Sequence, residues 1–173
     1  TFDTVTTAAE AFVTIRTTMR PCLLELMDQA TINAVEDFRP MGLDRTVGAL
    51  LIGQSDAPGD VRSGEITAMR AACDAAGATE CFVTDDAEEG EMFVQARRVS
   101  FHALEQRGAL LLEDVGVPIP LLPDLLTRIV AISRVHGVEI PTVAHAGDGN
   151  THPLIVYAAD DPDSEHRARM AFG

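Results

Sequence analysis

The residues of this chain best suited to chemistry are two histidines on either side of a glycine-rich turn. They lie in the segment His145-Ala146-Gly147-Asp148-Gly149-Asn150-Thr151-His152-Pro153. Gly147 and Gly149 permit positive φ, so we predict a compact turn that brings the two imidazoles together. Two neutral imidazoles form half of a site for zinc or a related divalent metal, which needs a third protein ligand. From spacing alone, the alternative is a tight hairpin in which one histidine caps a carbonyl and the other is solvated.

Two polar residues inside the turn, Asp148 and Asn150, are expected to hold it in shape. Both residue types tolerate left-handed backbone and form hydrogen bonds with their own backbone. Histidines that bind a metal usually also need a neighbour that fixes the orientation of the imidazole. We therefore expect Asp148 and Asn150 to orient the two histidines.

The segments on both sides of the turn have the composition of short strands. Residues 139–144 precede the turn and residues 154–157 follow it, and both are apolar and rich in β-branched side chains. A hairpin between two strands requires an antiparallel pair. Further strands are predicted at residues 22–27, 48–52, 81–83 and 108–112.

Helices are predicted between these strands from the spacing of apolar residues. The apolar residues Met92, Ala96, Val99 and Ala103 would lie on one side of a central helix. Gly77 and Gly137 are predicted to end two other helices. Gly48 and Gly108, which open two strands, have the same separation as the two helix-ending glycines, which indicates a weak internal β-α-β repeat. The expected fold class is α+β, a largely antiparallel sheet with helices packed on it and ferredoxin-like β-α-β units.

Composition limits the class of protein and its partners. The 173 residues, 46% of them hydrophobic, suit one domain with a real core. A net charge of −14 disfavours nucleic acid and anionic membrane surfaces as partners, and we expect no membrane span. Cys22, Cys73 and Cys81 are odd in number and have apolar neighbours, so we expect buried free thiols and a cytoplasmic location.

The nine-residue turn resembles the His-Ala-Gly-Asp-Gly-Asn-x-His-Pro signature of the C-terminal domain of FAD-linked oxidases. That family contains D-lactate dehydrogenases, glycolate oxidases and D-2-hydroxyglutarate dehydrogenases, within the vanillyl-alcohol oxidase-like flavoproteins. Three further landmarks follow the family's order: Leu24-Glu25-Leu26-Met27-Asp28, Arg97-Arg98 and Glu113-Asp114-Val115-Gly116-Val117-Pro118. The resemblance implies that residues 1–173 form a single substrate-binding cap domain, a fragment of a longer flavoenzyme that lacks the N-terminal FAD domain and the C-terminal end.

The resemblance also implies roles for individual residues. His145 and His152 would bind a divalent metal, which we expect to be zinc, iron or manganese. In the family a third ligand comes from a later Gly-Glu-His-Gly segment, which this chain lacks. Arg97 would bind the substrate carboxylate, whereas we expect Arg98 on a solvated helix face. Phe101 and Leu112 stand where the D-2-hydroxyglutarate branch has a threonine and a lysine, so the resemblance gives no support for a second carboxylate on the substrate.

The function that the resemblance implies is FAD-dependent oxidation of a 2-hydroxy acid, of the D-lactate or glycolate type, to a 2-oxo acid. FAD would be bound mainly by the other domain of the same polypeptide, and the catalytic base, a histidine, would lie outside this chain. We expect this chain alone to be inactive and to bind no FAD. Two alternatives from other classes are a stand-alone metal-dependent hydrolase and a non-catalytic ferredoxin-like binding module.

Overall fold

The computed structural model describes residues 1–145 and 149–173, which form helices packed against an antiparallel sheet. The fold class predicted from the sequence is therefore confirmed. In chain order the elements are α1 (Val5–Thr18), β1 (Leu23–Asp28), α2 (Gln29–Phe38), β2 (Ala49–Gln54), α3 (Gly59–Ala75), α4 (Ala87–Glu105), β3 (Ala109–Leu112), β4 (Val115–Gly116), the 3₁₀ turn η1 (Ile119–Leu121), α5 (Leu122–His136), β5 (Thr142–His145), β6 (Asn150–Tyr157) and α6 (Pro162–Phe172).

The sheet follows the order β2-β1-β5-β6-β3, with β4 also paired to β6, and every strand pair is antiparallel. The predicted hairpin is confirmed, because β5 and β6 pair directly across the glycine-rich turn. Gly149 adopts φ +79°, and a Cβ there would lie only 2.4 Å from the carbonyl oxygen of Val117. This end of the turn therefore requires glycine. Gly147 lies outside the described residues.

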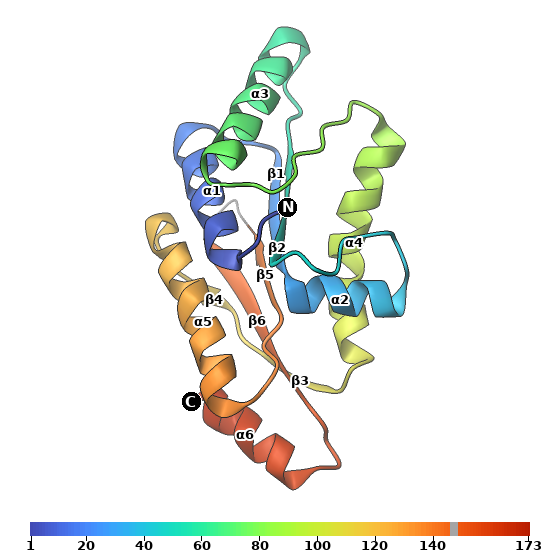
Figure 1. The fold of residues 1–173 in the computed structure, drawn as a ribbon, viewed down its shortest axis with the longest axis vertical. Coiled ribbons are helices and arrows are strands. Elements are labelled where there is room, and N and C mark those ends of the chain that lie inside the picture. The colour runs from blue at the N-terminus through green and yellow to red at the C-terminus, as the bar shows by residue number, and fades with distance from the viewer. Residues whose placement is uncertain (146–148) are drawn as a thin grey trace.

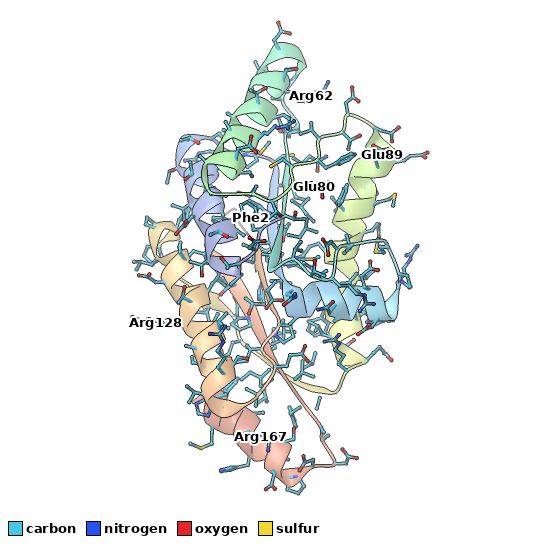
Figure 2. The ribbon with its side chains drawn as sticks, in the orientation of Figure 1. Phe2, Arg62, Glu80, Glu89, Arg128 and Arg167 are labelled. Atoms are coloured by element: carbon cyan, nitrogen blue, oxygen red, sulfur yellow. The ribbon has the colours of Figure 1, made fainter. Side chains whose placement is uncertain are left out.

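Alternating side chains of the strands serve two separate cores, one on each face of the sheet. Figure 1 shows α1, α3 and α5 on one side of the sheet and α2 and α4 on the other. Leu24 and Leu26 of β1 point to the first layer, and Met27 points to the second. Figure 2 shows a buried and an exposed side chain: Phe2 lies among the elements, whereas Arg128 projects outward from α5.

The strand predicted at residues 81–83 is wrong, because this segment has no regular structure and Phe82 is 62% exposed. The edge of β2 is taken by the N-terminal residues, since the Phe2 N–H donates to the Ala49 carbonyl at 3.0 Å. The Phe82 ring packs instead against Phe93 of α4, with 5.9 Å between ring centroids. The first copy of the expected β-α-β repeat therefore lacks its second strand.

The three cysteines are free, as predicted, but the prediction that all are buried is wrong. Cys22 is exposed because it precedes the first residue of β1, and Cys73 and Cys81 are half-buried. Among the described residues, no helix is long and apolar enough to cross a membrane.

Candidate functional site

Three charged or ionisable side chains meet on the sheet face covered by α4. Glu25 of β1 lies directly opposite His145 of β5 in the strand register, and α4 brings Arg97 over both. Glu25 Oε1 is 2.9 Å from His145 Nδ1, and Glu25 Oε2 accepts a hydrogen bond from Arg97 Nε at 3.0 Å. One carboxylate thus connects a histidine and an arginine that come from distant parts of the chain.

The contacts of His145 determine which ring nitrogen carries the proton. Arg97 approaches the other nitrogen, Nε2, with its terminal NH2 group at 3.2 Å. A guanidinium can only donate, so Nε2 accepts, and Nδ1 carries the proton and donates to Glu25. Glu25 therefore holds His145 with the Nε2 lone pair directed away from β1, the form that a metal ligand or a hydrogen-bond acceptor requires.

His152 joins this group from the next strand. It lies opposite Val143 in the β5–β6 pair and so occupies the same face of the sheet as His145, one diagonal step away. The two imidazole rings have centroids 5.0 Å apart and are nearly perpendicular, at 80°. On the outer side, Asp114 Oδ1 is 3.8 Å from His152 Nδ1. The structure thus brings together the two histidines that the sequence singled out, and their role as metal ligands stays a prediction.

The two neighbouring arginines of α4 have different surroundings. The Arg97 side chain is 15% exposed, and besides Glu25 and His145 it contacts Ser100 Oγ at 3.3 Å. Arg98 is 59% exposed and pairs with Glu91 on the same helix. The predicted solvated position of Arg98 agrees with this geometry, and Arg97 is the arginine that faces the histidines.

A pocket of about 220 Å³ lies between α4 and the sheet, with Arg97 and His152 in its wall. Ser100 adds a third polar group, and apolar side chains form the rest. The apolar lining residues are Phe101, Leu104, Leu112, Val143 and Leu154. A second hollow of about 730 Å³, between residues 39–41 and the first half of α4, contains none of the residues selected from the sequence. The pocket beside Arg97 is therefore the candidate site.

The turn residues Asp148 and Asn150 were expected to orient the histidines. Asp148 lies outside the described residues. Asn150 sits opposite His145 in the strand register, a position that suits the predicted orienting role, and that role stays a prediction. Within residues 1–145 and 149–173, no three His, Cys, Asp or Glu side chains are grouped so as to hold a metal ion.

The residue of the site that sequence reasoning missed is Glu25, which entered only as part of a family landmark. A signal was present, because Glu25 is a charged residue in the middle of a strand, flanked by the buried Leu24 and Leu26. Charged side chains in such positions need a partner. What the sequence could not supply was the identity of the partners, since Arg97 and His145 are 72 and 120 residues away.

Solved structures of other proteins contain the same fold. A 4-ethylphenol oxidase from Gulosibacter chungangensis matches with a TM-score of 0.64 at 13% identity, over 98% of this chain and 40% of that protein. An alkyldihydroxyacetonephosphate synthase matches with a TM-score of 0.58 at 13% identity, over 98% of this chain and 37% of that one. The fold therefore occurs as a part of larger proteins.

The family follows from the sequence comparison. The model of the C-terminal domain of FAD linked oxidases matches residues 1–173, and this chain belongs to that family. Glycolate oxidase subunit GlcD of Bacillus subtilis (strain 168) is 29% identical over 153 residues, 88% of this chain and 33% of that protein. The protein of the same name from Escherichia coli (strain K12) is 31% identical over 151 residues, 87% of this chain and 30% of that protein. The chain thus spans about a third of the length of these relatives.

Proposed function

We propose that residues 1–173 form the substrate-binding cap domain of an FAD-dependent oxidoreductase that oxidises a 2-hydroxy acid, of the D-lactate or glycolate type, to a 2-oxo acid. Family membership and the relatives named glycolate oxidase subunits support the class of reaction. The observation that carries the proposal is the Arg97 guanidinium, which is largely buried and sits 3.2 Å from His145 in the wall of a pocket shared with His152.

Arg97 is the group that binds the substrate carboxylate in this proposal. Its Nε is fixed by Glu25, whereas the contacts of its two terminal nitrogens with the described residues are longer, 3.3 Å to Ser100 and 3.2 Å to His145. Charge-assisted bonds from a guanidinium to a carboxylate are shorter, roughly 2.7–2.9 Å, and stronger. A carboxylate entering the pocket can therefore replace these two contacts while Glu25 still holds the arginine in place.

His145 and His152 are the proposed ligands of a divalent metal: zinc, iron or manganese. The donor set fits in part, because the two rings are neighbours and Glu25 orients His145 as carboxylates behind metal-binding histidines do. A third ligand has to come from outside the described residues. When bound, such a metal polarises a coordinated hydroxyl and lowers its pKa. The lone pair of His145 that it would use now faces Arg97, so metal binding requires that the guanidinium turn toward the substrate.

Hydride acceptance is the chemistry that FAD supplies when bound. In this proposal FAD is bound mainly by another domain of the same polypeptide, and a base outside this chain removes the hydroxyl proton. The contribution of the present chain is to bind and orient the acid. A stand-alone hydrolase would instead need a carboxylate that completes the histidine pair, and the described part of the chain contains no such group of three. The cytoplasmic location stays a prediction.

The histidine pair can be tested directly by titrating this chain with Co²⁺ and following the visible absorption of the bound ion. We expect weak binding with two protein ligands, which D-lactate strengthens because its hydroxyl and carboxylate add donors. His145→Ala should remove the signal. The exposed His102→Ala is the matched control, since His102 lies on α4 and pairs with Glu105 of the same helix. Equal titration of His145→Ala and the unchanged chain would mean that His145 is not a ligand.

A further inference from the structure

Most of the wall of the pocket beside Arg97 and His152 is apolar. We infer that it holds the side chain of the 2-hydroxy acid, and that the preferred substrate carries an aliphatic or small aromatic group rather than a bare hydrogen or a second carboxylate. This inference rests on the proposed function for the position of the carboxylate on Arg97.

The apolar wall consists of a buried floor and an exposed rim. Leu104 of α4 and Leu154 of β6 are 0% and 2% exposed, and Val143 of β5 lies beside them. Phe101 and Leu112 form the rim and are 44% and 49% exposed. A side chain inserted here would remove its own surface and that of the two rim residues from water, which is the source of hydrophobic affinity.

Among the described lining residues, polar side chains are confined to Arg97, Ser100 and His152. An acid whose carboxylate lies on Arg97 therefore has polar protein groups beside its carboxylate and an apolar space for its side chain, the tail of the acid. The volume, about 220 Å³, is below the roughly 300–1,000 Å³ usual for sites of drug-sized ligands, so the pocket suits a small acid. Glycolate, which has no carbon beyond the hydroxyl carbon, would leave the apolar wall in contact with water.

The two rim residues also exclude a second charge. Phe101 and Leu112 come from different elements, one from α4 and one from β3, and both border the space that the tail would occupy. Arg97 is the one arginine or lysine among the described lining residues, and the first carboxylate uses it. A carboxylate transferred into an apolar space without a partner loses its hydration and gains nothing in return. A substrate with two carboxylates is therefore disfavoured.

The test is the affinity of this chain for a series of D-2-hydroxy acids, measured by calorimetry in the presence of Zn²⁺. The series consists of glycolate, which is achiral, and the D forms of lactate, 2-hydroxy-4-methylpentanoate and 2-hydroxyglutarate. We expect affinity to rise by about fourfold for each methylene or methyl group that the pocket buries. The branched acid should bind tightest and 2-hydroxyglutarate more weakly than lactate. Equal affinity across the series, or tightest binding of glycolate or 2-hydroxyglutarate, would overturn the inference.

A substitution on the rim sharpens the test. Leu112→Lys should reverse the order, weakening the branched acid and strengthening 2-hydroxyglutarate by about tenfold or more, because it supplies a cation for the second carboxylate. Val135→Lys is the matched control, since Val135 is an exposed valine of α5 that lies outside the lining of the pocket. It adds the same charge and should leave the order unchanged. A reversal by both variants would be an effect of net charge alone and would contradict the assigned role of Leu112.

A ligand without the hydroxyl, 4-methylpentanoate, separates this inference from the proposed function. If it binds as well as its hydroxy analogue and loses affinity in Leu112→Lys, the pocket is correctly assigned and recognition of a 2-hydroxy acid is wrong. If all hydroxy acids bind alike and 4-methylpentanoate does not bind, the proposed function holds and the apolar pocket is wrong. Absence of binding by every acid at millimolar concentration contradicts both.

Discussion

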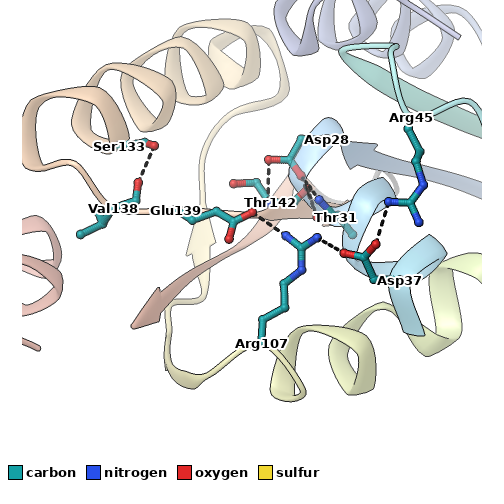
Figure 3. A network of polar contacts seen from close by, with 9 residues as sticks. All are labelled: Asp28, Thr31, Asp37, Arg45, Arg107, Ser133, Val138, Glu139 and Thr142. Carbon is teal, nitrogen blue, oxygen red and sulfur yellow. Dashed lines mark hydrogen bonds and ion pairs between the residues drawn. The ribbon is translucent and has the colours of Figure 1, made fainter. Parts of the chain in front are cut away.

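Two carboxylates on strand β1, three residues apart, form polar clusters of very different kinds. Glu25 contacts the charged or ionisable side chains of His145 and Arg97. Asp28 accepts hydrogen bonds from the backbone N–H groups of Thr31 and Thr142, at 2.9 Å each, and from the Thr31 hydroxyl at 2.7 Å. Figure 3 shows the second cluster, in which Asp28 joins the start of α2 to the start of β5. Both clusters connect β1 with β5, at opposite ends of their pairing.

The two clusters differ in the groups that each carboxylate contacts. Asp28 is the main acceptor for polar groups that water does not reach, because Thr31 and Thr142 are 0% and 2% exposed. Glu25 instead contacts two side chains of the candidate site, and His145 is 47% exposed. In the proposed function these two side chains exchange their other contacts for a ligand. The two carboxylates of one strand therefore differ, because Asp28 stabilises the backbone around it whereas Glu25 contacts side chains of the candidate site.

The largest effect is expected for Asp28→Ala. It removes the N-cap of α2, leaves the Thr142 N–H without its acceptor and deprives the Thr31 hydroxyl of its main partner, and together these losses should cost about 4 kcal/mol of unfolding free energy. Asp86→Ala is the matched control, because Asp86 caps α4 in an exposed position and should cost only about 1 kcal/mol. Urea denaturation measures both. Equal losses would mean that Asp28 is no more than a surface cap.

The pH dependence of stability should also identify Asp28. Burial raises the pKa of Asp28 to about 6 from 3.8, even though its hydrogen bonds from Thr31 and Thr142 act in the opposite direction. Since the folded state holds this proton more tightly than the unfolded chain, the contribution of Asp28 is fully present below about pH 4 and is lost as pH rises through 6. The loss should reach at most about 3 kcal/mol, from roughly two pKa units.

The measurement is the difference in unfolding free energy between the unchanged chain and Asp28→Asn at several pH values. The amide does not titrate, so the difference isolates Asp28 from the other carboxylates. The unchanged chain should lose stability relative to Asp28→Asn between about pH 4 and pH 7. No loss between pH 4 and pH 7, with a gain as pH rises toward about 4, would indicate that the hydrogen bonds outweigh burial and that the pKa is lowered.

The scaffold was largely predictable because its signals are local. Gly77 and Gly137 mark helix ends and adopt φ of +83° and +61°, as glycine at these positions predicts. The exceptions depend on distant residues. The segment at residues 81–83 has strand composition, but Phe2 occupies the edge of β2 beside Ala49. Helix α2 was not predicted, and it begins at an Asp28 cap whose second oxygen accepts a hydrogen bond from Thr142 in another part of the chain.

The site was predictable only for residues that a family signature or a resemblance marks. His145 and His152 lie where the predicted hairpin puts them, and Arg97 lies on the predicted central helix. Glu25 lies in one of the landmark segments, but the resemblance assigns it no role, and its contacts arise from pairing β1 with β5, which joins residues 120 positions apart. Local sequence patterns specify elements and turns, whereas a carboxylate that bridges two elements becomes visible only when strand order is known.

An intermediate effect, on binding rather than on stability, is expected for Arg97→Lys. The ammonium retains the charge but loses the planar fork that can face Glu25, His145 and a substrate carboxylate together. The affinity for D-lactate should fall by on the order of 1.5–3 kcal/mol, or roughly ten- to a hundredfold. Arg98→Lys should change it little, because Arg98 is exposed and pairs with Glu91. Calorimetry on this chain checks both variants, and a full-length enzyme should show the same ratio in kcat/KM. Equal effects of the two would assign the wrong arginine.

The smallest expected effect, and the most specific, is that of Glu25→Gln. Its amide keeps the shape of Glu25 but removes the charge that attracts the Nδ1 proton of His145 and the guanidinium of Arg97. We expect the neutral ring of His145 to shift toward the form with the proton on Nε2, and the affinity for D-lactate to fall about tenfold, the lower end of what loss of an orienting partner costs. Unfolding free energy should change by less than at Asp28, because the amide oxygen can still accept a hydrogen bond from Arg97.

The ring-nitrogen chemical shifts of His145, measured by NMR in this chain, distinguish positioning from general loss of structure. Glu91→Gln is the control, because it removes the same charge from the exposed partner of Arg98 and should leave those shifts unchanged. If Glu25→Gln weakens D-lactate binding while the His145 tautomer stays the same, Glu25 acts on Arg97 alone. If it lowers the unfolding free energy as much as Asp28→Ala does, the contrast between the two carboxylates of β1 is wrong, and Glu25 belongs to the scaffold.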